Sequence, residues 1–242
     1  MKRPILIIAA MDIEVVFLVK KMQNVNEFDI NKYKFFEGTI SDYPIVICIC
    51  NCMTINAATA TCIAIQKYNP IAIINEGTSG AHSRNIHRGD IVIGEKCVNI
   101  VSYKSPHKSE NGGSNSLEWK LLNFIHGEKN RLEYQHGDEN LIKLAKNVEL
   151  DEGDVHFGII GSGDCWNNET DRILWLNKTC GTLCEEMEGI AVYTLANNFN
   201  IPVLGIRVIS NNEILGEKYD EKTALKSQKF TYKLILKFIN KY

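Results

Sequence analysis

The chain has 242 residues, and its 27 basic and 29 acidic side chains give a net charge of -2 at neutral pH. The composition is 45% hydrophobic, 23% charged and 9% aromatic, which excludes collagen-like, low-complexity and disordered classes. The near-neutral charge argues against nucleic acid as the main partner, because phosphate binding needs a basic face. No run approaches the roughly 18 apolar residues of a membrane span, so no membrane contact is expected. We expect the whole chain, residues 1–242, to form a single domain.

The first residues imitate a secretory signal, because a basic start precedes the apolar run 4–10. That run is short and continues directly into helical periodicity, so a first buried strand is the better interpretation. The eight cysteines are too few and too irregularly spaced for a disulfide framework. Cys48, Cys50 and Cys52 are expected to share one face of a strand. No C-x-x-C pair indicates zinc, so free thiols in a reducing cytoplasm and no metal are expected.

Apolar runs and helical patterns alternate along the chain. Strands are expected at 4–10, 34–39, 44–51, 71–75, 90–102, 155–161 and 202–210. Helices are expected at 12–23, 54–68, 138–149, 168–178, 187–198 and 220–240. This alternation indicates a mostly parallel sheet with helices on both faces, which is a three-layer αβα arrangement. The segment 102–116 is polar and long for a loop of a compact domain, so a binding loop and a plain solvated loop are both open.

Motifs for phosphate loops and dinucleotide binding are absent from the sequence. Four places nevertheless depart from the pattern of an α/β core. Glu14 follows the first strand, where open α/β sheets bind their ligands, although a carboxylate also suits a helix N-terminus. The small residues of 75–81, which include Thr78, follow a later strand and form either a binding concavity or a plain turn.

The third place is a cluster of three glutamates before an apolar helix. It includes Glu186 and Glu188, with Met187 between them. The two carboxylates suit vicinal hydroxyls and the methionine suits an apolar sugar face, whereas an acidic helix cap is the alternative. The fourth place is Arg207, which interrupts an apolar strand. A buried guanidinium needs a carboxylate or an anionic ligand, and either Glu14 or Glu188 is the expected partner.

The order and spacing of these pieces are more specific than any one of them. In chain order the sequence contains Met11-x-x-Glu14, Asn75-x-Gly77-Thr78-Ser79-Gly80, Gly89-Asp90-Ile91-Val92, Ser162-Gly163-Asp164-x-Trp166, Glu186-Met187-Glu188-Gly189 and Arg207-Val208-Ile209-Ser210. Together they resemble the nucleoside phosphorylase/nucleosidase family, and most of all its methylthioadenosine/S-adenosylhomocysteine nucleosidases. The resemblance runs from about residue 4 to the final helix, apart from 102–136. It implies a phosphorylase/hydrolase-like fold with a mixed, twisted central sheet, no cofactor, and a homo-oligomer, most simply a dimer.

The resemblance also implies hydrolysis of the N-glycosidic bond of a purine nucleoside, with a role for each matching residue. Glu14 would be the base that activates water, and Thr78 and Arg207 would help to hold that water. Glu188, with Glu186 beside it, would bind the ribose hydroxyls. The transition state of such a cleavage is oxocarbenium-like, so it needs nearby negative charge and an activated leaving group.

The remaining roles concern the sugar face and the base. Met187 would pack under the sugar, Trp166 would stack on the purine, and backbone groups near Asn167 would reach the base edge. The nucleosidases protonate the purine with an aspartate where this chain has Asn211. An asparagine donates a hydrogen bond but is no general acid. The base is therefore activated by hydrogen bonding alone, which favours 6-oxopurines, or Glu213 replaces the acid, or catalysis is lost.

Two alternatives to a nucleosidase stay open. A phosphorylase of this family would carry a glycine-rich, arginine-containing phosphate turn after the first strand. The turn 10–14 is acidic instead, which favours water as the nucleophile. The second alternative is a nucleoside-binding homologue without turnover, and it is supported by Asn211.

Overall fold

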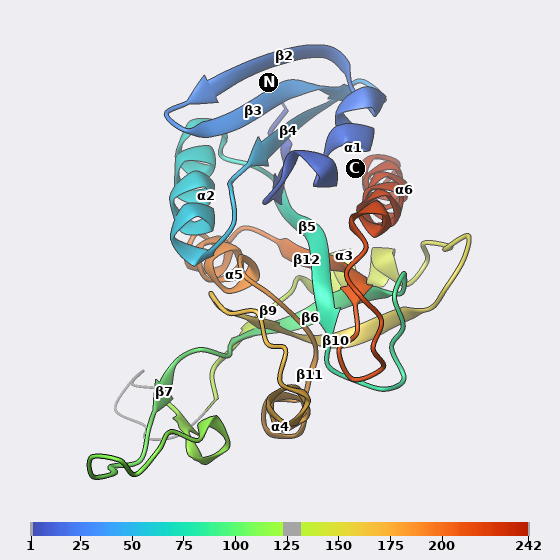
Figure 1. Ribbon diagram of the computed structural model, residues 1–242. Helices are drawn as coiled ribbons and strands as arrows, with labels where there is room; N and C mark the ends of the chain where they lie inside the picture. Colours follow the sequence, from blue (N-terminus) through green and yellow to red (C-terminus); the bar gives the residue numbers. More distant parts are fainter. Residues whose placement is uncertain (1, 123–131, 242) are drawn as a thin grey trace.

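The computed structural model describes residues 2–122 and 132–241 (Figure 1). Its strands are β1 (Ile5–Ala9), β2 (Gln23–Ile30), β3 (Tyr33–Ile40), β4 (Tyr43–Ile49), β5 (Ala72–Ala81), β6 (Ile91–Asn99), β7 (Tyr103–Lys104), β8 (Lys120–Leu121), β9 (Tyr134–His136), β10 (Val155–Ser162), β11 (Thr182–Glu186) and β12 (Val203–Asn211). Its helices are α1 (Val16–Lys21), α2 (Thr54–Tyr68), α3 (Glu139–Ala145), α4 (Thr170–Cys180), α5 (Gly189–Asn198) and α6 (Ala224–Ile239). Short 3-10 turns are η1 (Asp12–Glu14), η2 (Ser116–Glu118) and η4 (Glu221–Thr223). In this part of the chain, no helix has the length and apolarity that a membrane span needs.

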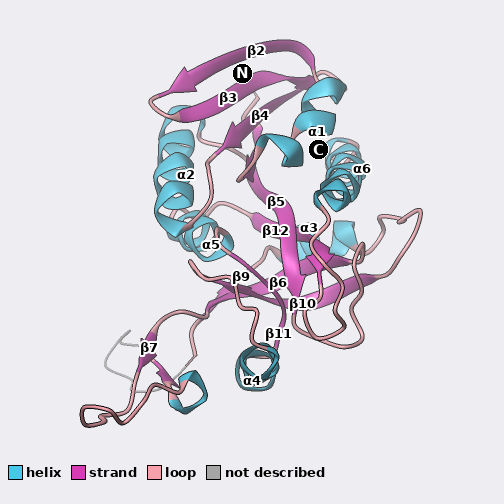
Figure 2. Ribbon diagram, in the orientation of Figure 1, coloured by secondary structure: helices cyan, strands magenta, loops and turns pink. Residues whose placement is uncertain are grey.

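One large mixed sheet runs through the centre, in the order β11-β10-β6-β12-β5-β1-β4-β3-β2. β1 lies parallel to β4 and β5, and β12 lies parallel to β5. β3 and β6 run antiparallel to β4 and β12. α2 and α5 cover one face of the sheet, and α1, α3 and α6 cover the other (Figure 2). The expected three-layer αβα fold with a mixed sheet is therefore confirmed.

The alternation of side chains along β1 explains the three layers. Ile5 and Ile7 point into the core beneath α1, α3 and α6, whereas Leu6 and Ile8 point into the core beneath α2 and α5. All four side chains are buried. A strand that is apolar on both faces must be covered on both faces, which is why the first strand reads as a continuous apolar run.

Five strands of the sheet pair with one another in a closed ring. They are β5, β12, β6, β10 and β11. β12 occupies one edge of β5, and β1 occupies the other edge only up to Asn75. Beyond that point β11 takes over the free edge, through the antiparallel pairs Ala81–Cys184 and Gly80–Glu185. The links β12–β6, β6–β10 and β10–β11 complete the ring. The carboxyl ends of β5, β11 and β12 are thereby brought together.

Two glycines allow a tyrosine to hold this ring from within. The Tyr193 hydroxyl on α5 donates to the Gly94 carbonyl oxygen at 2.7 Å and accepts the Gly205 backbone N–H. A Cβ atom would lie 2.6 Å from that hydroxyl at Gly94 and 2.8 Å from it at Gly205. The close approach therefore requires glycine on both β6 and β12.

The structure differs from the expected elements at several places. β2 was not expected, because most of its side chains are exposed and polar and lack apolar alternation. β11 was also not expected, because its two glutamates read as a helix cap. The strand expected to end at 75 continues to Ala81, since small polar residues fit a buried strand of the ring. The helix expected at 12–23 is divided into η1 and α1, and α5 begins at Gly189.

All eight cysteines are free thiols. β4 ends at Ile49, so the expectation that Cys48, Cys50 and Cys52 share one strand face is wrong, because only Cys48 belongs to the strand. Cys48 and Cys50 are buried, whereas Cys52 is exposed beyond the strand. In the segment 102–136, β7 and β8 form a small separate sheet that projects from the body (Figure 1). Residues 123–131 of that segment lie outside the described residues.

Candidate active site

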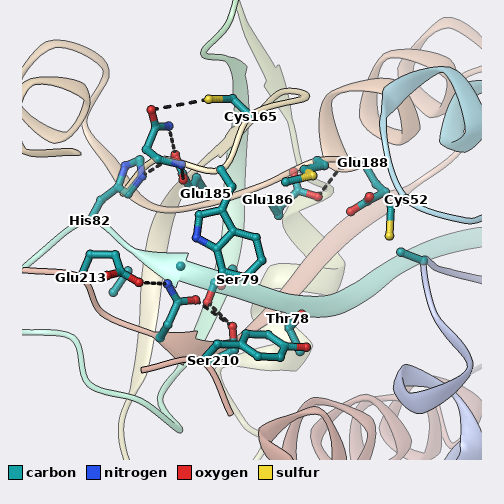
Figure 3. A pocket seen from close by; sticks show the side chains of 18 of the residues that line it. Cys52, Thr78, Ser79, His82, Cys165, Glu185, Glu186, Glu188, Ser210 and Glu213 are labelled. Atoms are coloured by element: carbon teal, nitrogen blue, oxygen red, sulfur yellow. Dashed lines mark hydrogen bonds and ion pairs between the residues drawn. The ribbon is translucent and has the colours of Figure 1, made fainter. Parts of the chain in front are cut away.

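A pocket lies where the carboxyl ends of β5, β11 and β12 meet η1. Eight of the residues expected in the site line it: Glu14, Thr78, Trp166, Asn167, Glu186, Met187, Glu188 and Asn211. Arg207 lies behind the wall, with 1% of its surface exposed, and is not a lining residue. Figure 3 shows His82, Glu185 and Glu213 towards one end of the pocket and Glu188 towards the other.

Glu14 belongs to the carboxylate end of the pocket, which we define by Glu14, Glu186 and Glu188. Its Oε2 accepts the backbone N–H groups of Ala10 at 3.0 Å and Met11 at 3.1 Å. Its Oε1 accepts the N–H of Thr78 at 2.8 Å and the hydroxyl of the same residue at 3.1 Å. Burial raises the pKa of Glu14, although these backbone bonds lower it. A fixed carboxylate with a raised pKa is suited to accept a proton.

Glu186 is the partner of Arg207, which corrects the expectation that Glu14 or Glu188 meets this charge. The Arg207 Nη2 donates to Glu186 Oε2 at 2.6 Å, and both side chains are buried. Burial alone would raise the pKa of Glu186, but the Arg207 charge and the hydrogen bonds that the carboxylate accepts together outweigh burial and hold the pKa below its usual range. Arg207 also donates to the carbonyl oxygen and the side chain of Asn75. The pair fixes β12 and β5 to the end of β11.

The oxygens of Glu186 are occupied by the chain itself. Besides Arg207, they accept the backbone N–H groups of Glu188 at 2.9 Å and of Gly189 at 2.8 Å and 3.0 Å. Glu186 therefore acts as the anchor of the turn between β11 and α5. This differs from the expected role beside Glu188, because a carboxylate with these partners has little capacity left for ligand hydroxyls.

Glu188 is the second carboxylate that faces the pocket with acceptor capacity. Its Oε1 accepts the backbone N–H of Met53 at 2.9 Å, and its other oxygen has no hydrogen bond to the part of the chain that is described. Burial, together with the charge of Glu186, raises the pKa of Glu188 to about 8. Met187 precedes it on the pocket wall. This is a hydroxyl-binding group next to an apolar surface.

Trp166 and Tyr219 form an aromatic pair on the pocket wall. Trp166 marks what we call the aromatic end, and Tyr219 extends from it towards Thr78, which is bonded to Glu14. Their rings meet edge-on, with centroids 5.7 Å apart and planes at 62°. Trp166 is 52% exposed, so its surface is open for stacking with a planar ligand. The backbone N–H of the following residue, Asn167, donates to Glu185 Oε1 at 2.8 Å. The group expected to reach the base edge is therefore already bonded to the chain.

Asn211 lies at the end of β12, also at the aromatic end. Its Nδ2 donates to Glu213 Oε1 at 3.1 Å, and its Oδ1 accepts from the Ser210 hydroxyl at 3.0 Å. Glu213 lines the pocket as well. The two residues weighed for activation of the leaving group are thus in direct contact.

One further group on the pocket wall was not expected from the sequence. His82 is 1% exposed, and its Nε2 lies 3.0 Å from Glu185 Oε2, while its Nδ1 lies 2.8 Å from the Thr182 hydroxyl. In the sequence His82 is one of six scattered histidines, and Glu185 was interpreted as part of a helix cap. The antiparallel pairing of β11 with β5 brings His82 and Glu185 together, and this pairing is known only from the structure.

The comparisons with known proteins agree with this geometry. A family model described as the phosphorylase superfamily matches residues 4–240. A 5'-methylthioadenosine/S-adenosylhomocysteine nucleosidase from Halalkalibacterium halodurans is 30% identical over 208 residues, which are 85% of this chain and 84% of that protein. A protein of the same name from Anoxybacillus flavithermus is 25% identical over 98% of this chain and 99% of its own length.

A solved structure shares the fold. The crystal structure of the nucleosidase from Neisseria meningitidis, in complex with methylthio-immucillin-A, superimposes with a TM-score of 0.78. It is 22% identical and the match covers 97% of this chain and 99% of the other. The family resemblance expected from the sequence is confirmed, and the chain belongs to the phosphorylase superfamily.

Proposed function

We propose that this chain is an enzyme that hydrolyses the N-glycosidic bond of a purine nucleoside and releases the base and a ribose derivative. The observation that carries the proposal is the pair of buried carboxylates, Glu14 and Glu188, in a pocket whose wall also carries the aromatic rings of Trp166 and Tyr219. Aromatic surface suits a planar base, and carboxylates suit a sugar that becomes positively charged. The relatives, which are named as nucleosidases, support it.

Each of these residues has a separate role in the proposed reaction. Glu14 accepts the proton of a water molecule that attacks the anomeric carbon, and Thr78 holds Glu14 in place by two hydrogen bonds. Glu188 accepts hydrogen bonds from the ribose hydroxyls and, when ionised, stabilises the oxocarbenium-like state. Asn211 donates a hydrogen bond to the leaving base, and Glu213 lies beside it as the nearest carboxyl group. Arg207 acts from behind the wall, by holding Glu186.

Water is favoured over phosphate as the nucleophile by the charge of the pocket. The lining described for this pocket contains no lysine or arginine, and the buried Arg207 is neutralised by Glu186. A phosphate ion would face Glu14 and Glu188 without a cation to balance its charge. The phosphorylase alternative lacks such support.

The test measures base release from inosine, guanosine, adenosine, methylthioadenosine and S-adenosylhomocysteine, with and without added phosphate. Release that proceeds equally in both buffers supports hydrolysis, whereas strict dependence on phosphate contradicts it. Saturable nucleoside binding by calorimetry without base release over hours would favour the binding homologue, for which Asn211 is the supporting observation.

The proposal includes a homodimer in the cytoplasm. Two apolar side chains beside the pocket, Met53 and Ile55, are 52% and 77% exposed, as in surfaces that contact a partner. Light scattering coupled to size-exclusion chromatography tests the dimer, and a mass near 27.4 kDa would indicate a monomer.

A further inference from the structure

Two carboxylates from distant segments hold the start of α2. The Asp164 carboxylate accepts the Thr54 backbone N–H at 2.7 Å and the Thr54 hydroxyl at 2.8 Å, one on each oxygen. The preceding N–H, that of Met53, donates to Glu188 Oε1 at 2.9 Å. Figure 3 shows Glu188 and Cys52, the residue before Met53, at the same end of the pocket. Two successive N–H groups are therefore bound by the segments that follow β10 and β11.

α2 has no cap of its own. Met53 occupies the N-cap position, where Ser, Thr, Asp or Asn usually accepts an N–H of the first turn, and its side chain makes no such bond. The first N–H groups of a helix have no partner within the helix. Asp164 supplies an acceptor from 110 residues further along the chain, and its negative charge suits the positive end of the helix dipole. Asp164 therefore takes the place of the missing cap.

Met53 has a backbone conformation that normally requires glycine. Its φ is 82° and its ψ is 153°. A residue with a Cβ is strained there, and such strain persists only where the surrounding structure imposes it. The Met53 side chain is 52% exposed, so its own packing contributes little. The hydrogen bonds of the Met53 and Thr54 N–H groups lie on either side of the two strained dihedral angles and hold them.

We propose that Asp164 is a positioning residue for Glu188 and acts on it through Thr54 and Met53; this inference rests on the proposed function. By fixing the start of α2, Asp164 keeps Met53 in its strained conformation, with the N–H directed at Glu188. This bond occupies Oε1, so the carboxylate is oriented and its other oxygen is left for the ribose hydroxyls. If Met53 relaxed to a negative φ, its N–H would turn away and Glu188 would lose that contact.

The first experiment removes or keeps the two bonds of Asp164. Asp164→Ala removes both, whereas Asp164→Asn keeps them, because the amide oxygen accepts the Thr54 N–H and the amide nitrogen donates to the Thr54 hydroxyl. We use inosine or adenosine, whichever is cleaved faster. The value of kcat/KM should fall at least about 10-fold in the alanine variant and less than about threefold in the asparagine variant.

Binding of the free base is the internal reference, because Asp164 lies on the same loop as Trp166. Calorimetry with hypoxanthine or adenine should give affinities within about threefold of the parent's in both variants. If Asp164→Ala weakens the free base as much as it lowers kcat/KM, the loop has moved as a whole and the inference is overturned.

The ribose hydroxyls give a second comparison. The 2′,3′-dideoxy form of the same nucleoside lacks the groups that Glu188 binds, so Asp164→Ala should change its kcat/KM less than about threefold. A loss equal to that of the hydroxylated nucleoside contradicts the inference. If the parent cleaves neither nucleoside, the proposed function fails, and calorimetric dissociation constants replace kcat/KM in the same comparison. A parent that neither cleaves nor binds them contradicts both proposals.

Met53→Gly tests the route from Asp164 to Glu188. Glycine adopts a positive φ without strain, so it does not need Asp164 to hold it. In the double variant Met53→Gly/Asp164→Ala, kcat/KM should recover to within about threefold of the parent's value. Met53→Ala/Asp164→Ala is the matched control, because it removes the same side chain but keeps the Cβ, and it should not recover. A glycine double variant as impaired as Asp164→Ala contradicts the inference.

The strain itself is measured without activity. In urea denaturation with Asp164 present, Met53→Gly should unfold at a higher urea concentration than Met53→Ala, since only the glycine is free of strain. At an unstrained position near a helix the order is reversed, because glycine loses more backbone freedom on folding. That reversed order would show that Asp164 holds no strain at Met53, and would overturn the inference.

Discussion

The two ends of the pocket are built in different ways. At the carboxylate end, backbone N–H groups hold Glu14, Glu186 and Glu188, and most of these donors lie a few residues away along the chain. At the aromatic end, side chains from distant segments hold one another, as in the pair His82–Glu185. Short local turns therefore shape the surroundings of Glu14 and Glu186, although Thr78 and Arg207 also contact them from other strands. The position of Glu185 beside His82, in contrast, depends on how the ring of strands closes.

The largest effect is expected at the carboxylate end, from Glu14→Gln. The amide keeps the shape of the side chain but cannot accept the proton of water, so kcat should fall by at least about 100-fold. Binding of the free base, measured by calorimetry, should stay within about threefold, because the aromatic end is unchanged. An unchanged kcat would remove Glu14 from the mechanism.

The next largest effect is expected from Arg207→Met, on the free energy of unfolding. Loss of one partner leaves the Glu186 carboxylate buried and unpaired, which costs about 3–5 kcal/mol of unfolding free energy. Urea denaturation measures this cost. The double variant Arg207→Met/Glu186→Gln removes the unpaired charge and should recover part of it. A loss below about 1 kcal/mol in the single variant would show that the ion pair does not hold the carboxylate end together.

The pH dependence should also separate the two ends. The raised pKa of Glu188 means that the group is neutral below about pH 8, so kcat/KM should rise as the pH increases through about 8. Between its ordinary pKa of 4.5 and about 8, the folded state holds a proton that the unfolded state has lost. The unfolding free energy should therefore decrease as the pH rises through this range. Glu188→Gln should remove the rise in kcat/KM near pH 8 and should reduce the dependence of the unfolding free energy on pH, to which Glu14 with its raised pKa also contributes. A rise in kcat/KM near pH 8 that persists in this variant would assign it to another group.

The smallest effect is expected at the aromatic end, from Trp166→Ala. Loss of a stacking ring costs roughly 1–3 kcal/mol of base binding, so KM should rise on the order of 10-fold with little change in kcat. Trp166→Phe is the matched control, because it keeps an aromatic face and should raise KM less than threefold. Equal KM values for the alanine variant and the parent would show that the base does not stack here.

The sequence predicted groups of chain neighbours better than contacts between distant segments, for a physical reason. Glu186, Met187 and Glu188 are neighbours in the chain, so their proximity needed no knowledge of the fold. The partner of Arg207 was predicted wrongly, because it depends on the register between β11 and β12 around the ring. His82 and Glu185 are far apart in the chain and meet through a strand that read as a helix cap.

The fold was predicted in the same uneven way. Strands that are buried on both faces, such as β1, show as continuous apolar runs and were found. β2 was missed because it lies at the end of the strand order and most of its side chains are exposed, so burial does not constrain its composition. β5 was cut short because its second half carries the small polar residues that form the pocket wall.

The ring has one short seam, where β5 meets β11 in the pairs Ala81–Cys184 and Gly80–Glu185. Just beyond it, the backbone N–H of His82 donates to the Leu183 carbonyl oxygen at 2.8 Å. A seam of so few bonds opens at lower free energy than the long pairings beside it, so its amides should exchange with solvent deuterium earlier. A ligand that contacts both Asn211 and Glu185, which line the pocket, would span this seam and stabilise it, because a ligand that binds only the closed form stabilises that form. Binding of a ligand in the pocket can therefore be detected as slower deuterium uptake at the backbone amide of His82, without a measurement of turnover.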